Sequence, residues 1–261
     1  MDMKRFLTVM AALLVASTAM FAQTVEKTID IDDFTGIRAS DAFDVTLIQS
    51  KDYEVIVEVT EDFLPYLEVK NKKGVLELGF GKLPFKLKQK ERKRVAKATI
   101  SMPTLTYIEL SGSSKLTSDD QFSNTMHKFS IEMRGASNIE FLELKTPDVD
   151  IELDGGSKAT LKLRSSDVKA DLAGASKLKV TGETTDLEVK AKSASRFDGE
   201  RFETREAVIE ASGASSVDVF PTRKLSVNLT GASKCRYYGD EDKLSVKAEK
   251  VTGASSLKHH R

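Results

Sequence analysis

The sequence predicts an all-β protein, a single-stranded right-handed parallel β-helix (β-solenoid), and two observations support that prediction. The first is a small-residue motif, Gly-Ala-Ser or a close variant, that recurs in the second half of the chain. Its eight copies begin at Gly112, Gly135, Gly155, Gly174, Ser193, Gly213, Gly231 and Gly253. They are separated by 23, 20, 19, 19, 20, 18 and 22 residues. A repeat near this length is typical of coils that stack on one another.

The second observation is an alternation of apolar residues on both sides of each motif. Phe129, Ile131 and Met133 stand six, four and two residues before Gly135, and the other copies follow the same pattern. Alternation over six residues predicts a strand with one buried side. Apolar residues also occur four and six residues after each first position, as at Ile139 and Phe141. Each coil therefore has two strands, joined by a turn.

The motif glycines are predicted to be structural turn residues. Glycine adopts backbone conformations that cost other residues energy, and the small residue after it permits a tight corner. One coil buries too few side chains to offset the ordering of its backbone, so the coils are stable only when stacked. A right-handed path is the preferred one for parallel crossovers.

The chain is divided into three segments. Residues 1–22 combine a basic start, an apolar run and a small residue, Ala22, which predicts a signal peptide; a retained membrane anchor is the alternative. Residues 23–102 alternate less regularly and are interpreted as irregular N-terminal coils with a basic loop at 82–94, or alternatively as a separate β-domain. Residues 103–261 hold the regular coils.

Three sequence segments precede the coils: Phe34-Thr35-Gly36-Ile37, then Ser40 to Leu47 (SDAFDVTL), then Met102-Pro103-Thr104-Leu105. Together with the Gly-Ala-Ser coils they resemble the autotransporter-adhesin head domain of the GIN type, common in secreted proteins of Bacteroidetes. The resemblance covers roughly residues 30 to 257. It implies a right-handed β-helix and an envelope or extracellular location, and it supplies no catalytic residues.

Composition restricts the partners. Lys plus Arg and Asp plus Glu number 40 each, so net charge gives no reason to expect a nucleic acid.

The single cysteine, Cys235, cannot form an intramolecular disulfide and falls on an apolar position of its coil, which predicts a core residue.

Two charged columns are predicted on the surface. The basic ladder stands three residues after the motif start and comprises Lys115, Lys158, Lys177, Arg196 and Lys234. The acidic ladder stands three residues before it and comprises Glu109, Glu132, Glu152, Asp171 and Glu210. Like charges stacked at strand spacing repel. The ladders either form a surface that tracks a repetitive polymer, or keep the solenoid soluble while partly neutralising one another.

No catalytic, cofactor or metal site is predicted. The aspartates at 148, 167 and 186 and Glu206 supply one carboxylate per coil, which favours turn capping over calcium binding. A serine two residues after every motif start is a repeated structural hydroxyl, whereas a catalytic serine is singular and needs a base. The three histidines, His127, His259 and His260, form no zinc or general-base pattern.

A basic stretch interrupts the first part of the chain. It comprises Lys82, Lys86, Lys88, Lys90, Arg92, Lys93 and Arg94. Apolar residues alternate with these charges, so the stretch is interpreted either as a loop that contacts anionic lipid or polysaccharide or as a solvated connection. With Lys158, Lys177 and Arg196 it makes up the candidate binding surface.

The predicted function is that of a non-enzymatic exported envelope protein, an adhesin or interaction scaffold. Its location would be the periplasm, the cell surface or the medium. The alternative is a β-helical protein that binds or degrades polysaccharide, which fold analogy alone supports. The expected partner is a glycan or an envelope component. Because the last coil lacks an obvious polar cap, self-association through the C-terminal coil is also expected.

Overall fold

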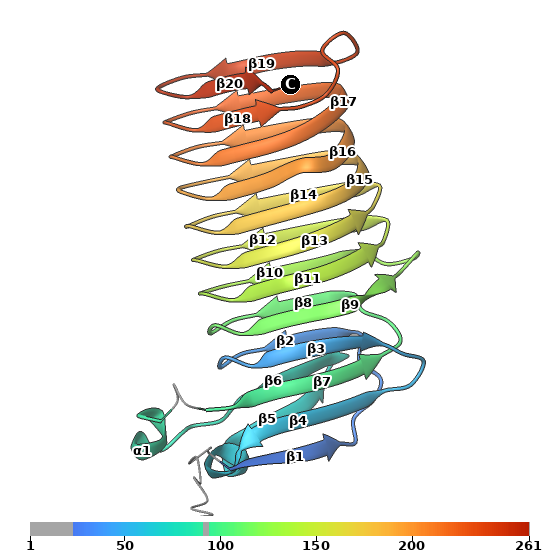
Figure 1. Cartoon of the computed structure of the whole chain (residues 1–261), viewed down its shortest axis with the longest axis vertical. Helices are drawn as coiled ribbons and strands as arrows, with labels where there is room; N and C mark the ends of the chain where they lie inside the picture. Colours follow the sequence, from blue (N-terminus) through green and yellow to red (C-terminus); the bar gives the residue numbers. More distant parts are fainter. Residues whose placement is uncertain (1–22, 91–93, 261) are drawn as a thin grey trace, which may run out of the picture.

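The computed structural model describes residues 23–90 and 94–260, and the predicted signal peptide lies outside this part of the chain. The described chain forms a β-solenoid of about 8 turns with parallel stacked strands, as predicted. Figure 1 shows the coils stacked along the long axis of the molecule, with the tight turns aligned on one side. No helix among the described residues is long and apolar enough to cross a membrane.

Each regular coil contributes one strand to each of two faces. The first face, before the turns, contains β8 (Tyr107–Leu110), β10 (Phe129–Met133), β12 (Asp148–Leu153), β14 (Asp167–Leu172) and β19 (Ser245–Val251). The second face, after the turns, contains β9 (Lys115–Ser123), β11 (Asn138–Lys145), β13 (Lys158–Arg164), β18 (Lys234–Tyr237) and β20 (Ser256–His259). Three long strands begin on the second face and end on the first: β15 (Lys177–Ala191), β16 (Arg196–Ala211) and β17 (Ser216–Leu229).

The core lies between the two faces and is built by equivalent residues of successive coils. Ile131 of β10 pairs in parallel with Ile151 of β12, and Met133 pairs with Leu153. All four side chains are at most 1% exposed. One residue of the apolar pattern lies outside the core. The register shifts after Ile139, so Leu142 enters the core and Phe141 is only half-buried.

The turns explain why glycine recurs. Gly155 and Gly174 both have positive φ, 71° and 68°, in the left-handed region that favours glycine. A Cβ on Gly174 would lie 2.7 Å from the carbonyl oxygen of Gly155 in the coil below. These two turns therefore favour glycine for its conformation and for close stacking. Ser193 adopts the same conformation, with φ of 63°.

The N-terminal segment stacks its coils out of chain order. Its parallel strands are β2 (Gly36–Ala39), β3 (Asp44–Gln49), β6 (Val75–Phe80) and β7 (Ala96–Met102). The β2 and β3 coil lies between the coil of β6 and β7 and the coil of β8 and β9. Antiparallel strands complete this end: β1 (Thr24–Ile29), β4 (Glu54–Thr60) and β5 (Leu67–Lys72). Two short helices, η1 (Glu61–Tyr66) and α1 (Phe85–Lys88), lie beside them.

The opposite end of the solenoid is open. The strands β19 and β20 form the last described coil, at the top of Figure 1. Val246 and Val251 of β19 are 37% and 40% exposed, whereas Leu225 and Leu229, their partners in β17, are fully buried. The apolar side of this coil has no further coil packed on it among the described residues. Self-association through it stays a prediction.

Candidate binding surface

The basic ladder forms on the second face as the sequence spacing predicts. Lys158 of β13 pairs in register with Lys177 of β15, which pairs with Arg196 of β16. All three side chains are exposed. Adjacent parallel strands lie about 4.8 Å apart, so these three cations follow one another at that spacing along the solenoid. Asn138 and Ser216 occupy the same position in the flanking strands and separate the three from Lys115 and Lys234.

The members of the basic ladder differ in their counter-charges. Lys115 lies 3.7 Å from Glu140, and Arg196 lies 3.2 Å from Asp218. Lys158 and Lys177 have no ion pair with any described residue, and neither does Lys179, which is exposed two residues further along β15. At the centre of the ladder, Lys158 and Lys177 are therefore two neighbouring ammonium groups without an ion pair, whereas Lys179 pairs in register with Asp198 of β16.

A buried carboxylate, Asp218, holds the basic ladder at Arg196. Its side chain is only 2% exposed, and its carboxylate accepts hydrogen bonds from Arg236 Nε at 2.5 Å and Nη2 at 2.6 Å. Its Oδ2 also accepts a hydrogen bond from Arg196. A buried carboxylate needs such partners, because an unpaired buried charge is costly. The same hydrogen bonds and charge raise the pKa of Arg236 above its usual value.

The acidic ladder lies on the other face. Glu109, Glu132, Glu152 and Asp171 pair in register through β8, β10, β12 and β14. Arg38 of β2 neutralises the first of them, with Nε 2.5 Å from Glu109. No ion pair among residues 23–90 and 94–260 joins this ladder to the basic one. The two ladders therefore do not neutralise one another by direct ion pairs.

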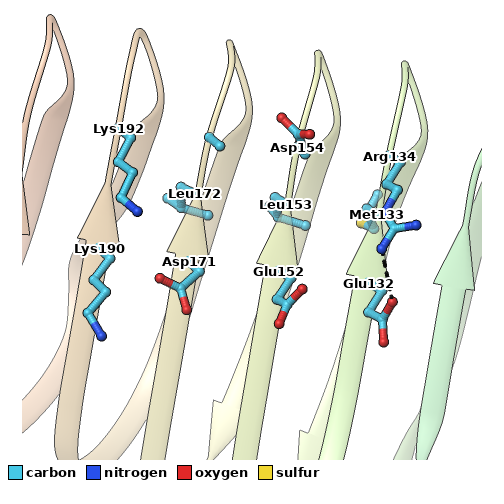
Figure 2. Close-up of a pocket in the computed structure, with 11 residues that line it drawn as sticks. Glu132, Met133, Arg134, Glu152, Leu153, Asp154, Asp171, Leu172, Lys190 and Lys192 are labelled. Carbon is cyan, nitrogen blue, oxygen red and sulfur yellow. Dashed lines mark ion pairs between the residues drawn. The ribbon is translucent and has the colours of Figure 1, made fainter.

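The acidic ladder is interrupted at a groove that opens beside the turns. Lys190 of β15 occupies the position after Asp171, and Glu210 of β16 restores the acidic pattern. The groove has a volume of about 460 Å³. Figure 2 shows that its side chains come from two rows, Glu132, Glu152, Asp171 and Lys190 in one, and Arg134, Asp154 and Lys192 in the other. Ala173 leaves a gap in the second row.

Some charges in the groove have ion-pair partners and others have none. Arg134 lies 3.6 Å from Glu132, and Lys190 lies 2.5 Å from Glu188. Glu152, Asp171 and Lys192 have no ion pair among the described residues. The groove was not predicted from the sequence. Two breaks in the repeat indicate it: a lysine at 190 in an acidic column and an alanine at 173 in a charged one.

The third column of acids is also in register. Asp148, Asp167 and Asp186 pair across β12, β14 and β15, and Glu206 follows in β16. Burial raises the pKa of Asp167, and repulsion from Asp148 and Asp186 adds to this. No cluster of His, Cys, Asp or Glu with the geometry of a metal site occurs in the described part of the chain.

The described part of the basic stretch, residues 82–90 and 94, lies apart from the ladder, on the connection between β6 and β7 beside the N-terminal end (Figure 1). Lys82, Lys86 and Lys88 are exposed and form no ion pair among the described residues, whereas Lys90 lies 2.9 Å from Asp62. Arg94 is half-buried, with its guanidinium 4.3 Å from the ring centroid of Phe80. Arg92 and Lys93 lie outside the described residues.

The remaining candidates have structural surroundings. Cys235 is 1% exposed in the core, and burial raises the pKa of its thiol to about 12. The motif serines of all coils but the last are buried at the corners, where Ser195 and Ser215 donate hydrogen bonds to carbonyl oxygens of Leu172 and Ala191. His259 packs against Tyr237, with ring centroids 5.1 Å apart.

Comparison with solved structures finds the same architecture. A putative adhesin from Parabacteroides distasonis has a TM-score of 0.78 at 16% identity, covering 92% of this chain and 98% of that one. A putative adhesin from Parabacteroides merdae has a TM-score of 0.77 at 17% identity, with coverages of 92% and 97%. A putative lipid binding protein from P. distasonis gives 0.78 at 17% identity, with the same coverages. These likenesses show the fold.

No curated protein matches the chain. The model of one family, described as "Putative auto-transporter adhesin, head GIN domain", matches residues 33–240. The match begins just before β2, includes all the regular coils up to β18 and contains both charged ladders. The chain therefore belongs to the auto-transporter adhesin head GIN domain family.

Proposed function

We propose that this chain is an exported interaction scaffold of the adhesin kind whose basic ladder binds an extended anionic polymer, such as an acidic glycan of an envelope or cell surface. Membership of an adhesin-domain family supports export and attachment to a surface component. The observation that carries the proposal is the register of Lys158 and Lys177, which places two uncompensated cations on neighbouring strands.

Burial and hydrogen bonding within the fold do not account for these lysines. The repulsion between the two lysines destabilises the fold. Side chains of alternating charge along the column would keep the surface equally soluble without this repulsion. A polymer with one anion per repeat unit, lying along the solenoid axis, would meet Lys158, Lys177 and Arg196 in succession. Lys179 adds a second cation on β15. The chain has no Trp, so recognition would depend on charge and hydrogen bonding more than on ring stacking.

The scaffold is proposed to bind without turnover. The ladder repeats one residue type on equivalent positions, whereas acid–base catalysis of glycosidic cleavage uses two carboxyl groups in different environments. The family's adhesin description and the adhesin neighbours favour the same conclusion.

The test is binding of the purified protein to alginate, an acidic polysaccharide, with dextran as the neutral polymer. We expect binding to alginate alone, weakened at least roughly tenfold in a Lys158→Gln/Lys177→Gln variant by loss of two contacts to carboxylates of the polymer. A Lys169→Gln/Lys224→Gln variant changes net charge equally on the first face and should bind as the parent does. Equal loss in both double variants, or no loss in either, would refute the ladder as the site.

The groove of Figure 2 favours one second candidate, an enzyme acting on charged polysaccharide. It brings Glu152 and Asp171 close to Lys190 and Lys192, and these carboxylates lack ion pairs. Product release from acidic polysaccharides that stops in a Glu152→Gln or Asp171→Asn variant would establish this activity. Absence of product with a panel of such polymers, while binding persists, would support the scaffold.

A further inference from the structure

An exposed aromatic side chain stands among lysines at the connection between β6 and β7. Phe85, the first residue of α1, is 75% exposed, whereas most large apolar side chains of the described chain are in the core. Lys86 and Lys88 belong to the same helical turn, and Lys82 precedes it. In Figure 1, α1 projects sideways from the stack at its N-terminal end. An aromatic ring held in water beside cations is suited to an amphipathic, negatively charged partner.

The base of this connection is fixed to the solenoid. Lys90 pairs with Asp62, and the N–H of Gly81 donates a hydrogen bond to the carbonyl oxygen of Tyr66 at 2.8 Å. The Arg94 guanidinium packs on Phe80. The tip of the connection is held by short-range hydrogen bonds from the N–H groups of residues 87 and 88 to the carbonyl oxygen of Pro84. The fold therefore presents Phe85 and the lysines in place, so that little ordering is needed on binding.

We infer that the segment from Lys82 to Lys88 docks the protein on an anionic phospholipid bilayer. Lys82, Lys86 and Lys88 have no counter-charge among the described residues, and an anionic leaflet supplies one. Phe85 would bury its ring at the boundary between headgroups and acyl chains, where aromatic residues gather. The two contributions add, because binding at a membrane surface strengthens with buried apolar area and with electrostatic attraction to anionic lipids. This inference uses residues outside the basic ladder and stands independently of the proposed polymer binding.

A second exposed apolar side chain supplies the comparison within the same molecule. Met126 is 84% exposed in the connection between β9 and β10, but its cationic neighbour Lys128 forms an ion pair with Asp150. Met126 therefore has exposure without free lysines beside it. If exposure alone led to lipid contact, both Phe85 and Met126 would enter the bilayer. If unpaired lysines nearby are also required, only Phe85 would do so.

The absence of Trp from the chain makes a direct test possible. A Phe85→Trp variant and a Met126→Trp variant each carry a single tryptophan, which reports its surroundings by fluorescence. With vesicles of phosphatidylglycerol and phosphatidylcholine we expect a blue shift for Phe85→Trp and none for Met126→Trp. Vesicles of phosphatidylcholine alone should shift neither.

Charge variants complete the test by vesicle co-sedimentation. The Lys86→Gln/Lys88→Gln variant should bind the anionic vesicles roughly 25-fold more weakly, about fivefold for each charge removed. The Lys158→Gln/Lys177→Gln variant should sediment like the parent, which separates this inference from the proposed function. An unshifted Phe85→Trp, an equal shift of Met126→Trp, an equal shift with neutral vesicles, or loss of binding only in the ladder variant would overturn membrane docking by this segment.

Discussion

Lys177 stands directly beside Lys158 in the parallel register of β13 and β15, and neither lysine has an ion pair with a described residue. This arrangement repeats like charge on neighbouring strands, which is destabilising. The fold keeps it although β13 carries two other cations that are neutralised, Lys162 by Glu143 and Arg164 by Glu183. The proposed polymer binding would give these two unpaired lysines a role that Lys162 and Arg164 do not need.

Reversing one charge of the pair should stabilise the protein. In Lys177→Glu the new carboxylate faces Lys158, so we expect the free energy of unfolding to rise by about 0.2–1 kcal/mol. Urea denaturation at low salt measures it, and added salt should reduce the gain. Lys234→Glu is the matched control, because its strand neighbours are Ser216 and Ser256. A similar gain in both variants would show that the repulsion between Lys158 and Lys177 is negligible.

The two glycines Gly174 and Gly156 should differ in how well they tolerate replacement by alanine, because a Cβ meets backbone atoms closely only at Gly174. Gly174→Ala places a Cβ 2.7 Å from Gly155 O at positive φ, so we expect a loss of about 1–3 kcal/mol in the free energy of unfolding. Gly156→Ala is the comparison, since its nearest atom, Gly135 O, lies at 3.7 Å and other coils have alanine there. That variant should change stability by no more than about 0.5–1 kcal/mol. Chemical denaturation of both decides; equal losses would contradict the stacking argument.

The raised pKa of Asp167 should appear in the pH dependence of stability. A carboxyl group whose pKa is raised in the folded state binds its proton more tightly there than in the unfolded chain. Its ionisation therefore destabilises the fold above the folded-state pKa, and this cost disappears as the pH falls through that pKa. We expect Asp167→Asn to be more stable than the parent at neutral pH, with the difference vanishing below the ordinary Asp value of 3.8. A constant difference at all pH values would mean that the effect is not ionisation.

Asp218 should restrain the basic surface as well as support the fold. Replacing it with Asn removes the counter-charge of Arg196 and Arg236, so we expect lower stability by about 1–3 kcal/mol and tighter binding to an anionic polymer. Thermal denaturation and polymer titration measure the two effects. Weaker polymer binding in a folded Asp218→Asn variant would show that the position of Arg196 matters more than its free charge.

Cys235 should be chemically inert in the folded protein. Its thiol is 1% exposed and its pKa is raised to about 12, so thiolate is scarce at neutral pH. A thiol-reactive chromophore should label the protein only after denaturation. Rapid labelling of the native protein would place Cys235 in a locally opening segment.

The sequence was sufficient to predict the regular coils, because each repeats one alternation and one turn and contacts only its neighbours. It predicted the register that aligns Lys158 with Lys177 for the same reason. It was insufficient to predict the stacking order of the N-terminal coils. The coil of β2 and β3 lies between the coil of β6 and β7 and the coil of β8 and β9, and this order depends on pairings between distant segments. It also did not show that Leu142 enters the core in place of Phe141, since a bulge shifts the register without a mark in the pattern.

The groove beside the turns could not be predicted for another reason. It exists because the short side chain of Ala173 leaves space between charged neighbours on adjacent coils. Which of its charged side chains stay without a partner depends on the ion pairs that the others form. The sequence shows the substitutions at Ala173 and Lys190. Only the three-dimensional arrangement shows that they border one cavity.

The central claim, that the basic ladder binds an anionic polymer, is tested most directly by the salt dependence of alginate binding. Cations that contact a polyanion release its counterions, so the logarithm of the binding constant falls with the logarithm of salt concentration in proportion to the number of contacts. The parent should show a clear negative slope, which becomes shallower by about 1–2 in Lys158→Gln/Lys177→Gln. The same slope for parent and variant, with both binding equally, would contradict the account.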